Sequence, residues 1–367
     1  MKVAHLTSVH ARYDTRIFLK QCRSLAKAGY DVSLVVADGL GNETRDGVRI
    51  ADVGKSVGRV GRMLGATRRV LTRALEIDAD VYQLHDPELL PVGLSLKRRG
   101  KRVIFDSHED VPQQILSKPY LHPIARRVAS GLMNRFEIYA CHRFDHVLAA
   151  TPFIRDKFLR HGIECADINN FPMLGELESD AGWSEKKREV CYVGGMARIR
   201  GATELVRAIG LCQSGARLNF AGPIQGSELA ASLRQMREWK QVDEKGFLNR
   251  EEVRGVLAHA MAGVVTFLPL PNHIDAQPNK MFEYMSAGVP VIASHFPLWR
   301  EIVEGNECGI CIDPQKPEEI AAAIDYLVEN PETARRMGES GRKAVYDRYN
   351  WGKEEEKLLA LYRSLKA

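Results

Sequence analysis

One pattern constrains the fold of this chain more than any other. Short apolar, β-branched runs alternate with amphipathic helical stretches from one end to the other. Such alternation predicts an α/β fold with parallel sheets, in which each helix returns the chain to the start of the next strand. It breaks at a polar stretch, residues 175–188, where we expect a domain linker, and then starts afresh. Because 367 residues are many for one core, we expect two domains, 1–174 and 175–349, with a helix over about 350–367 that packs back on the first.

The runs and stretches give an expected order of elements. In the first half they predict strands at 3–7, 32–36, 48–52, 81–84, 103–106, 146–149 and 165–169, and helices at 14–28, 60–76, 88–99, 124–141 and 152–160. In the second half they predict strands at 190–193, 217–221, 264–267, 289–293 and 309–312, and helices at 203–211, 228–239, 251–259, 280–287, 298–304, 318–329, 332–346 and 351–365. Two doubly wound sheets bind ligands at the carboxyl ends of their strands, and we expect these ends to face each other across a cleft.

Composition narrows the class of protein. The chain is 45% hydrophobic and 27% charged, and it holds no apolar run of membrane-spanning length, which predicts a soluble globular protein. Its first residues enter a strand-like segment without the features of a signal peptide, so we expect a cytoplasmic protein. The odd number of cysteines, seven, argues against a disulfide framework. We interpret the single close pair, Cys308 and Cys311, as structural thiols and not as a redox or zinc motif.

Basic charge is concentrated in the first half. Residues 1–170 hold 27 Lys and Arg against 19 Asp and Glu, a net charge of +8, whereas 171–367 hold 25 against 28, a net charge of −3. Segment 55–73 alone carries six basic residues and no acid: Lys55, Arg59, Arg62, Arg68, Arg69 and Arg73. Two readings stay open, namely peripheral contact with an anionic membrane or acceptor and an ordinary surface helix with a solvated basic face. Nucleic acid is not expected, because no aromatic-rich binding module accompanies the charge.

The most informative motif is a pair of acids eight residues apart, Asp275 and Glu283. Pro278 between them fixes a turn, and Asn279 is placed to cap a helix that carries Lys280 in its first turn. Free amides at a helix start and an ammonium group together make an anion site that would fit a diphosphate. The two carboxylates can accept hydrogen bonds from the hydroxyls of a ribose and a hexose.

A second motif is a glycine-rich turn that follows an expected strand. Gly194 and Gly195 open it, Arg198 and Arg200 follow, and a helix comes next. Glycine lets backbone amides approach a phosphate closely, and guanidinium groups pair with phosphate oxygens in a bidentate way. The sequence therefore predicts a second set of phosphate-binding groups.

Together these segments resemble the retaining glycosyltransferases of the GT-B type, in which two Rossmann-like domains face each other, and specifically the family 4-like, group 1 enzymes with a Glu-x7-Glu signature. The resemblance implies a UDP- or GDP-sugar as donor, with no required cofactor or metal. It implies that the first acid touches the donor sugar and the second the ribose. Asp275 stands where Glu is usual, Arg200 where Lys is usual, and Gly195 where Arg is usual.

The same resemblance assigns further donor contacts. Gly222 follows a strand, and the backbone of Gly246, Phe247 and Leu248 is expected to pair with the edge of the base. Gln277 precedes the turn of the acidic motif and joins the donor site. Neither the segment at Gly222 nor the segment 246–248 indicates whether the base is uracil or guanine.

Polar residues also follow the strands of the first half. His108 comes directly after strand 103–106, where the family has a His near the anomeric carbon, so we predict that it is catalytic together with Asp275 and Glu283. A structural histidine is the alternative, and Asp14 has an alternative as a helix cap. The residues predicted to contact the acceptor are His10, Asp14, Arg16, His85 and Glu109.

The predicted reaction moves a hexosyl-type group, with retention, to a lipid-linked or polysaccharide acceptor in cell-surface glycan biosynthesis. Its expected place is the cytoplasm, with peripheral contact through segment 55–73 to the inner face of the plasma membrane. One rival is a nucleotide-sugar epimerase or hydrolase on the same fold, which turnover without an acceptor would favour. The other is a sugar-nucleotide-binding protein without activity, which donor turnover would exclude.

Overall fold

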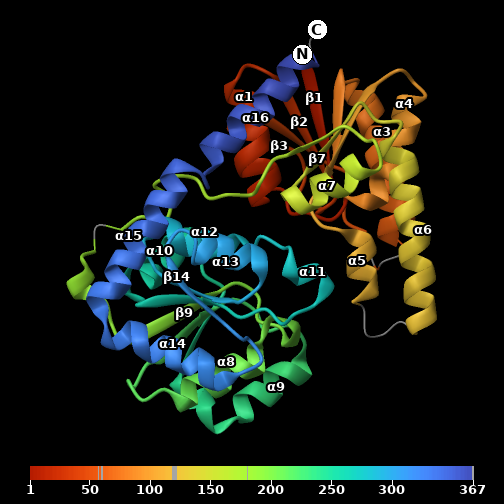
Figure 1. Ribbon diagram of the computed structural model, residues 1–367. Helices are drawn as coiled ribbons and strands as arrows, with labels where there is room; N and C mark the ends of the chain where they lie inside the picture. The colour runs from red at the N-terminus through yellow and green to blue at the C-terminus, as the bar shows by residue number, and fades with distance from the viewer. Residues whose placement is uncertain (57, 59–60, 118–121, 180, 366–367) are drawn as a thin grey trace. The chain divides into compact units, whose positions relative to one another are not determined.

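The computed structural model describes residues 1–367 except 57, 59–60, 118–121, 180 and 366–367 (Figure 1). The chain divides into two compact units: unit 1 consists of Met1–Asn170 and Lys353–Ala367, and unit 2 of Phe171–Gly352. The division falls just before residue 171 and not within the polar stretch 175–188. Each unit holds a mainly parallel sheet with helices, which confirms the α/β class that the alternation predicts.

Unit 1 is built on an eight-stranded sheet, as far as the chain is described, in the order β3-β4-β2-β1-β5-β6-β7-β8. All neighbours are parallel except β3, which pairs antiparallel with β4. The strands are β1 Lys2–Leu6, β2 Asp31–Val36, β3 Glu43–Arg45, β4 Val48–Asp52, β5 Val81–Leu84, β6 Arg102–Ser107, β7 His146–Ala149 and β8 Cys165–Asp167. Since β1, β5 and β6 are adjacent and parallel, the residues that follow them gather at one edge of the sheet.

The helices of unit 1 depart from the sequence-based prediction in four places. The expected helix 14–28 begins as a π-helix, and the described part of helix 60–76 does the same. The expected helix 88–99 begins as a 3₁₀-helix, and the short helix α5 after β6 was not predicted. Pro112 lies in the first turn of α5, a position that tolerates it. The helices are η1 Thr15–Cys22, α1 Arg23–Lys27, η2 Gly61–Ala66, α3 Thr67–Ile77, η3 Pro87–Leu89, α4 Leu90–Lys97, α5 Val111–Leu116, α6 Pro123–Cys141 and α7 Pro152–Arg160.

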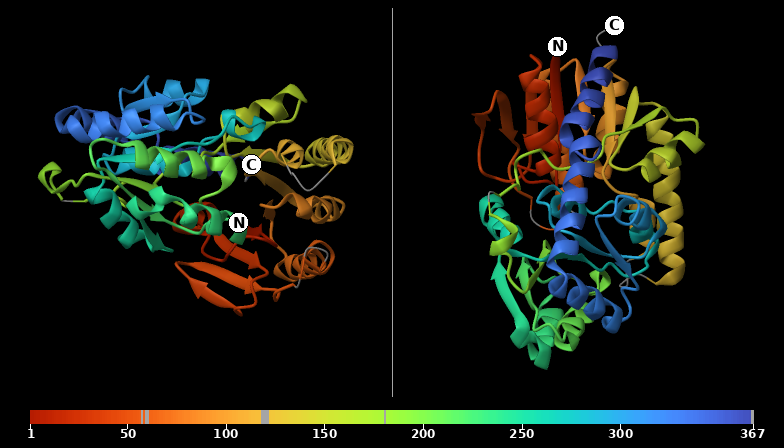
Figure 2. Two further views of the ribbon diagram at one scale, coloured as in Figure 1. Left: turned by 90° about the horizontal axis from the view of Figure 1, so that it is seen from below. Right: turned by 60° about the vertical axis from the view of Figure 1, so that its left-hand side comes forward.

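The last helix, α16 (Trp351–Ser364), begins in unit 2 and continues in unit 1 from Lys353 on. Figure 2 shows it running along the strands of unit 1, whose long α6 stands at the outer edge. Within unit 1 the side chain of Tyr362 is fully buried. The C-terminal part of the chain therefore supplies a piece of the core of unit 1.

Unit 2 has a six-stranded sheet in the described chain, all parallel, in the order β11-β10-β9-β12-β13-β14. Its strands are β9 Glu189–Val193, β10 Arg217–Ala221, β11 Val242–Gly246, β12 Ala262–Val265, β13 Val291–Ser294 and β14 Gly309–Ile312. The edge strand β11 escaped prediction because most of its residues are charged, and so did β3 at the edge of the other sheet. Charged residues at edges protect a sheet from pairing with another chain.

The helices of unit 2 cover both faces of its sheet (Figure 1). The expected helix 228–239 is wrong in length, because α9 ends at Gln235 and a 3₁₀-helix follows. The helices are η4 Trp183–Glu185, η5 Arg198–Arg200, α8 Ala202–Leu211, α9 Ser227–Gln235, η6 Arg237–Gln241, α10 Arg250–His259, α11 Pro271–Ile274, α12 Asn279–Ser286, α13 Pro297–Val303, α14 Pro317–Glu329 and α15 Pro331–Asp347. Cys308 is buried and donates to backbone carbonyls, in keeping with a structural thiol.

Basic segment 55–73 is only partly described, since residues 57, 59 and 60 lie outside the described chain. Within the described part, Val70 is fully buried in the core of unit 1. Arg69 donates to the backbone carbonyls of Val53 and Gly54 at 2.6 and 2.9 Å, and Arg73 pairs with Glu76. In the described chain, no helix is both long and apolar enough to cross a bilayer.

Candidate functional site

The first group of functional residues lies in unit 2, where the chain turns after β9. Gly194 has a φ of 106°, which favours glycine. Gly222, at the end of the neighbouring β10, packs on this turn so tightly that a Cβ on it would lie 2.4 Å from the carbonyl oxygen of Gly194. Arg200 donates to the carbonyl oxygen of Gly195 at 2.9 Å, which holds its side chain against the turn. Both glycines thus keep side chains out of a space next to backbone amides.

Lys280 faces the same turn. Lys280 is buried, and its Nζ is 3.4 Å from the ring centroid of Tyr192. Among the described residues this Nζ has no hydrogen-bond partner. A Cβ on Gly194 would be 3.6 Å from it, so the glycine leaves the ammonium open on that side. Burial, and then the charge of Arg200, hold the pKa of Lys280 well below its ordinary value. The site therefore presents a buried amino group that no acid pairs with directly, although the charge of Glu283 acts on it.

Besides Nζ of Lys280, six buried side-chain atoms of unit 2 lack a partner among the described residues, on Glu204, Gln241, Thr266, Gln277, Ser286 and Arg342. Two of them belong to the segments under discussion: Oγ1 of Thr266, which follows β12, and Oε1 of Gln277, which precedes α12. Thr266 lies against Gly201, where a Cβ would come 2.1 Å from the threonine carbonyl. Buried polar groups in folded proteins are nearly always paired, with protein, water or ligand. Thr266 follows the same end of the sheet as the turn at Gly194, because β12 and β9 are parallel neighbours, so its hydroxyl is available to a polar ligand at that end.

The start of α12 differs from the prediction. Pro278 is the N-cap residue, whereas Asn279 is the first residue of the helix, is exposed and does not cap it. The expected cap is therefore wrong, and the helix begins one residue before the predicted start at Lys280. Asp275 ends the short α11 and is partly buried, and burial raises the pKa of its carboxyl. The loop between them is held by a hydrogen bond from Nε1 of Trp299 to the carbonyl of Ala276 at 2.7 Å.

Glu283 is held in place by an arginine that sequence reasoning did not single out. Oε1 of Glu283 accepts from Nη1 of Arg250 at 2.7 Å, and the same guanidinium contacts Glu176 at 2.7 and 2.9 Å. Arg250 opens α10, which Asn249 caps through a capping box. Its position in the segment after β11 was visible in the sequence. Its pairing with a carboxylate 33 residues further on was not.

The remaining residues predicted to bind the donor line the outer part of this end of unit 2. Gly246 ends β11 with a φ of 70°, and its carbonyl accepts from the amide of Gly222 at 2.7 Å. Phe247, the next residue, is 89% exposed, whereas Leu248 packs on the core of unit 2. Arg198 is exposed on η5. These residues share an end of the sheet with Lys280.

In unit 1 the functional residues surround Asp106, the next-to-last residue of β6, which is fully buried. Arg16 grips its carboxylate with Nη2 at 2.5 Å and Nε at 3.1 Å, and its Nη1 donates to the carbonyl of Ile168 at 2.6 Å. Gln21 adds a donor at 2.8 Å. Burial raises the pKa of Asp106, but Arg16 and then His108 outweigh it and hold the pKa well below the ordinary value. The residue is a buried carboxylate with its charge balanced.

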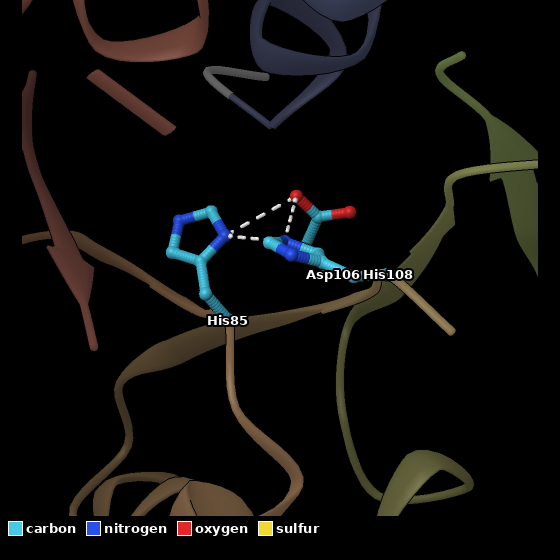
Figure 3. A group of neighbouring side chains, drawn as sticks. All are labelled: His85, Asp106 and His108. Carbon is cyan, nitrogen blue, oxygen red and sulfur yellow. Dashed lines mark hydrogen bonds and ion pairs between the residues drawn. The ribbon is translucent and has the colours of Figure 1, made fainter. Parts of the chain in front are cut away.

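Two histidines contact the same carboxylate (Figure 3). Oδ2 of Asp106 is 3.2 Å from Nδ1 of His85 and 3.3 Å from Nε2 of His108, and these two nitrogens are 3.1 Å apart. On the far side of its ring, His85 meets His5 at 2.9 Å. Burial lowers the pKa of His85 to about 4, so this ring is neutral at physiological pH. Of the pair, His85 is buried and His108 is partly exposed.

These three side chains could in principle hold a metal ion. Oδ2 of Asp106, however, already accepts hydrogen bonds from Arg16 and Gln21, and the guanidinium brings a full positive charge next to it. A metal cation would have to share the oxygen with that charge. We therefore interpret the group as a hydrogen-bonded network that fixes the ring of His108.

A second carboxylate, Asp86, orients His10. It accepts from the hydroxyl of Thr7 at 2.9 Å and the amide of Ser8 at 2.6 Å, and it pairs with Nδ1 of His10 at 2.9 Å. Burial lowers the pKa of His10, but the hydrogen bond and charge of Asp86 outweigh it and raise the pKa. The ring centroids of His10 and His108 are 4.9 Å apart. His10 and His108 thus lie side by side in the loops that follow β1 and β6.

The other residues predicted for the acceptor are placed differently. Arg16 and His85 are buried among the partners just described, so neither presents its polar atoms at the surface. Asp14 caps η1 by accepting from the amides of Arg16 and Ile17, which is the alternative reading of this residue. Glu109 is exposed and bonds to Gln114.

Three residues outside the predicted set complete the network. The hydroxyl of Tyr362 donates to Gln83 at 2.6 Å, Gln83 donates to Gln21 at 2.5 Å, and Gln21 reaches Asp106. Gln83 is a polar residue inside an otherwise apolar strand, and this signal could have revealed it. Nothing in the sequence indicates that Tyr362 contacts Gln83, which lies 279 residues earlier in the chain.

Two family models match the chain, one in each half. Residues 176–344 match the model described as "Glycosyl transferases group 1", and residues 15–170 match "Glycosyltransferase Family 4". Among curated relatives, the chain is 23% identical over 275 residues to alpha-D-kanosaminyltransferase of Streptomyces kanamyceticus, covering 69% of this chain and 70% of that one. It is 26% identical over 116 residues to the MMP alpha-(1->4)-mannosyltransferase of Mycolicibacterium hassiacum, which covers 31% of this chain but only 27% of the relative.

Solved structures match along the whole chain. Sucrose-phosphate synthase from Thermosynechococcus elongatus gives a TM-score of 0.80 at 18% identity, covering 99% of this chain and 98% of that one. Anabaena HepE in complex with UDP-glucose gives 0.76 at 16% identity, covering 99% and 100%. At this identity the likeness shows the fold, which is GT-B. With both halves matched by family models, the chain belongs to the group 1, family 4-like glycosyltransferases.

Proposed function

We propose that this chain transfers a hexosyl-type group, with retention, from a UDP- or GDP-sugar to a hydroxyl of a saccharide acceptor, either lipid-linked or a polysaccharide, in cell-surface glycan biosynthesis. Unit 2 binds the donor and unit 1 the acceptor. The observation that carries the proposal is the buried ammonium of Lys280, which has no partner among the described residues and faces a glycine turn. Burial disfavours the charged form of this amino group, and a bound anion would favour that form, so the amino group is suited to an anionic ligand.

In the proposed donor complex, the diphosphate lies between Lys280, Arg200 and the amide of Gly195. The neighbouring amides of Gly194 and Met196 donate to the carbonyls of Ala221 and Pro223. Glu283, held by Arg250, accepts from the ribose hydroxyls, and Asp275 from the sugar. As the bond to the anomeric carbon breaks, negative charge grows on the leaving diphosphate. Fixed cations next to it stabilise that charge without reorganisation.

In unit 1 we assign His108 to the reacting end of the sugar, because its ring is partly exposed and fixed by Asp106 and His85. Arg16 and His85 then act as positioning residues and not as direct acceptor contacts. His10 and Glu109 have exposed atoms and remain proposed acceptor contacts.

Retention follows from a same-face attack in this proposal. The acceptor oxygen forms its bond to the anomeric carbon while the bond from that carbon to the diphosphate oxygen breaks. The acceptor proton passes to the leaving phosphate, so no carboxylate nucleophile is required. Neither Asp275 nor Glu283 is needed as a covalent partner.

The most direct experiment measures turnover of a panel of UDP- and GDP-sugars, with and without saccharide acceptors. We expect release of one nucleoside diphosphate that becomes much faster when the right acceptor is added, with an α-linked product from an α-linked donor. Turnover at the same rate without any acceptor would favour a hydrolase or epimerase. Binding of a donor without any turnover would favour a non-catalytic protein.

Calorimetric titration with UDP and GDP tests the residues. We expect Arg200→Ala and Glu283→Ala each to weaken binding of the preferred nucleotide at least about tenfold, since each removes a charge-assisted contact. Arg207→Ala and Glu301→Ala, two exposed residues of the same unit, serve as matched controls and should bind like the wild type. If all four variants bind alike, the donor site lies elsewhere.

A further inference from the structure

The longest helix of unit 1, α6, exposes an apolar stripe. Ile124, Val128, Leu132 and Phe136 follow one another at intervals of four residues, and Tyr139 lies on the same face. Between 37% and 66% of each of these five residues is exposed. No other helix of the described chain carries more than one exposed large hydrophobic residue. At about 1.5 Å per residue the stripe is roughly 22 Å long.

Contacts inside unit 1 fix this face outward. Ser130 donates to the carbonyl of Pro112 in α5 at 2.8 Å, and Arg126 donates to that of Leu116 at 3.1 Å. Glu137 points inward and binds Lys157 of α7 at 2.6 Å. Figure 2 shows α6 at the outer edge of the unit. The helix cannot turn its stripe into the core without breaking these bonds.

The exposed charges of α6 itself all have one sign. Arg127, Arg135 and Arg143 are exposed, and Arg143 stacks over the ring of Tyr139 at 3.7 Å. The one acid of the helix, Glu137, is fully buried and paired. Arginine stems extend along apolar surface while their heads stay in water, and Tyr prefers the boundary between apolar and aqueous phases.

We propose that the face of α6 formed by Ile124, Val128, Leu132, Phe136 and Tyr139 with Arg127, Arg135 and Arg143 lies on an anionic lipid bilayer and holds unit 1 at its surface. An amphipathic helix with a basic rim binds in this way, with its apolar side chains in the headgroup region. The basic segment 55–73 is less suited to membrane contact, because its Val70 is buried and its Arg69 and Arg73 form bonds within the unit.

A second copy of the chain fits this face poorly. A specific protein interface uses about 20 to 30 residues a side, many more than this stripe supplies. In a two-fold dimer built on it, the arginines of one copy would meet the same arginines of the other. Anionic headgroups neutralise them instead. The inference does not depend on which acceptor the enzyme uses.

Vesicle flotation of the full chain tests the proposal. We expect the wild type to float with vesicles of equal parts phosphatidylglycerol and phosphatidylcholine, and not with phosphatidylcholine alone. Arg127→Glu with Arg135→Glu should lower the bound fraction at least about 25-fold, at roughly fivefold for each arginine. Val128→Ser with Leu132→Ser should lower it even at low salt. All four positions are exposed, so the fold should persist, which unchanged donor turnover would verify.

Two control variants make the result specific. Leu40→Ser with Leu159→Ser removes equally exposed apolar groups elsewhere in unit 1 and should leave flotation unchanged, and so should Arg68→Glu in segment 55–73. The proposal is overturned if the α6 variants float like the wild type or if only Arg68→Glu fails to float. It is equally overturned if the α6 variants convert a dimeric wild type into a monomer without changing its flotation. Because donor turnover is measured separately, a failure here leaves the proposed function standing.

Discussion

The two groups of functional residues solve the burial of charge in opposite ways. In unit 1 the buried carboxylate of Asp106 is surrounded by Arg16, Gln21 and two histidines, so its lone pairs and charge are matched within the protein. In unit 2 the buried ammonium of Lys280 has an aromatic ring beneath it and no hydrogen-bond partner among the described residues. The network around Asp106 has its hydrogen bonds and charge satisfied, so it serves to orient side chains. Lys280 has no hydrogen-bond partner among the described residues, so it is available to bind a ligand. The contrast separates a positioning site from a binding site.

Removal of the central carboxylate should have the largest effect. We expect Asp106→Asn to destabilise unit 1 by about 3–5 kcal/mol, because the guanidinium of Arg16 is left buried without its counter-charge. Chemical denaturation followed by circular dichroism measures this loss. The double variant Asp106→Asn with Arg16→Met should regain part of the stability, and a strictly additive loss would show that the two residues are not a balanced pair.

Lys280→Met should act in the opposite direction on stability. Replacing an unpaired buried cation by an apolar side chain of similar length should stabilise the free protein by about 1 kcal/mol, or about 2–4 °C in Tm. The same change should weaken UDP or GDP binding by roughly 30- to 100-fold. Thermal unfolding and calorimetry measure the two effects.

The matched control is Lys157, a buried lysine that is paired with acids. It is paired with Glu137 at 2.6 Å and Asp110 at 3.0 Å, so Lys157→Met should destabilise the protein and leave nucleotide binding unchanged. If both lysine variants lower the Tm alike, the distinction between a paired and an unpaired cation fails.

The pH dependence of nucleotide binding sharpens the same contrast. Burial and Arg200 depress the pKa of Lys280 in the free protein, and a bound diphosphate must raise it. Above the free-protein pKa each binding event therefore takes up a proton, and affinity should fall as pH rises, by up to about tenfold per pH unit. Calorimetry in buffers of different ionisation enthalpy counts the protons. A pH-independent affinity without proton uptake would mean that Lys280 is charged before the ligand arrives.

The smallest expected effect concerns the outer end of the unit 1 network. Tyr362→Phe should cost about 1 kcal/mol, because the side-chain oxygen of buried Gln83 loses its donor. Tyr326→Phe on α14, where the side chain is exposed, is the control and should change nothing. Denaturation curves of the two variants that coincide would place Tyr362 outside the network.

Much of the fold could be read from the sequence because local patterns specify it. Strands β5, β7, β10 and β14 have the predicted bounds, and α7 does as well, since apolar runs ended by polar or glycine residues define such elements. The edge strands β3 and β11 could not be predicted, because an edge strand half exposed to water carries charged residues. The π-helical start of η1 has no local signal either.

The site was predictable only as far as it follows strand ends. His108 follows the end of an apolar run, so its place at the carboxyl end of the unit 1 sheet could be argued from topology. Lys280 and Glu283 could be predicted from the start of a helix after Pro278. Whether a charge found there is paired depends on residues far along the chain. Arg250, which binds Glu283, illustrates this dependence, because no spacing in the sequence indicates the contact.

The position of Tyr362 has a consequence for how the protein is made. The hydroxyl that completes the Gln83, Gln21 and Asp106 network belongs to a helix that the ribosome delivers only after all of unit 2 has emerged. During translation, unit 1 therefore lacks its last helix, and the surface that this helix covers stays exposed while unit 2 is synthesised and folds. A protease or chaperone acting during translation would meet unit 1 in this incomplete form. Packing of the last helix then completes the core of unit 1 and protects it from both.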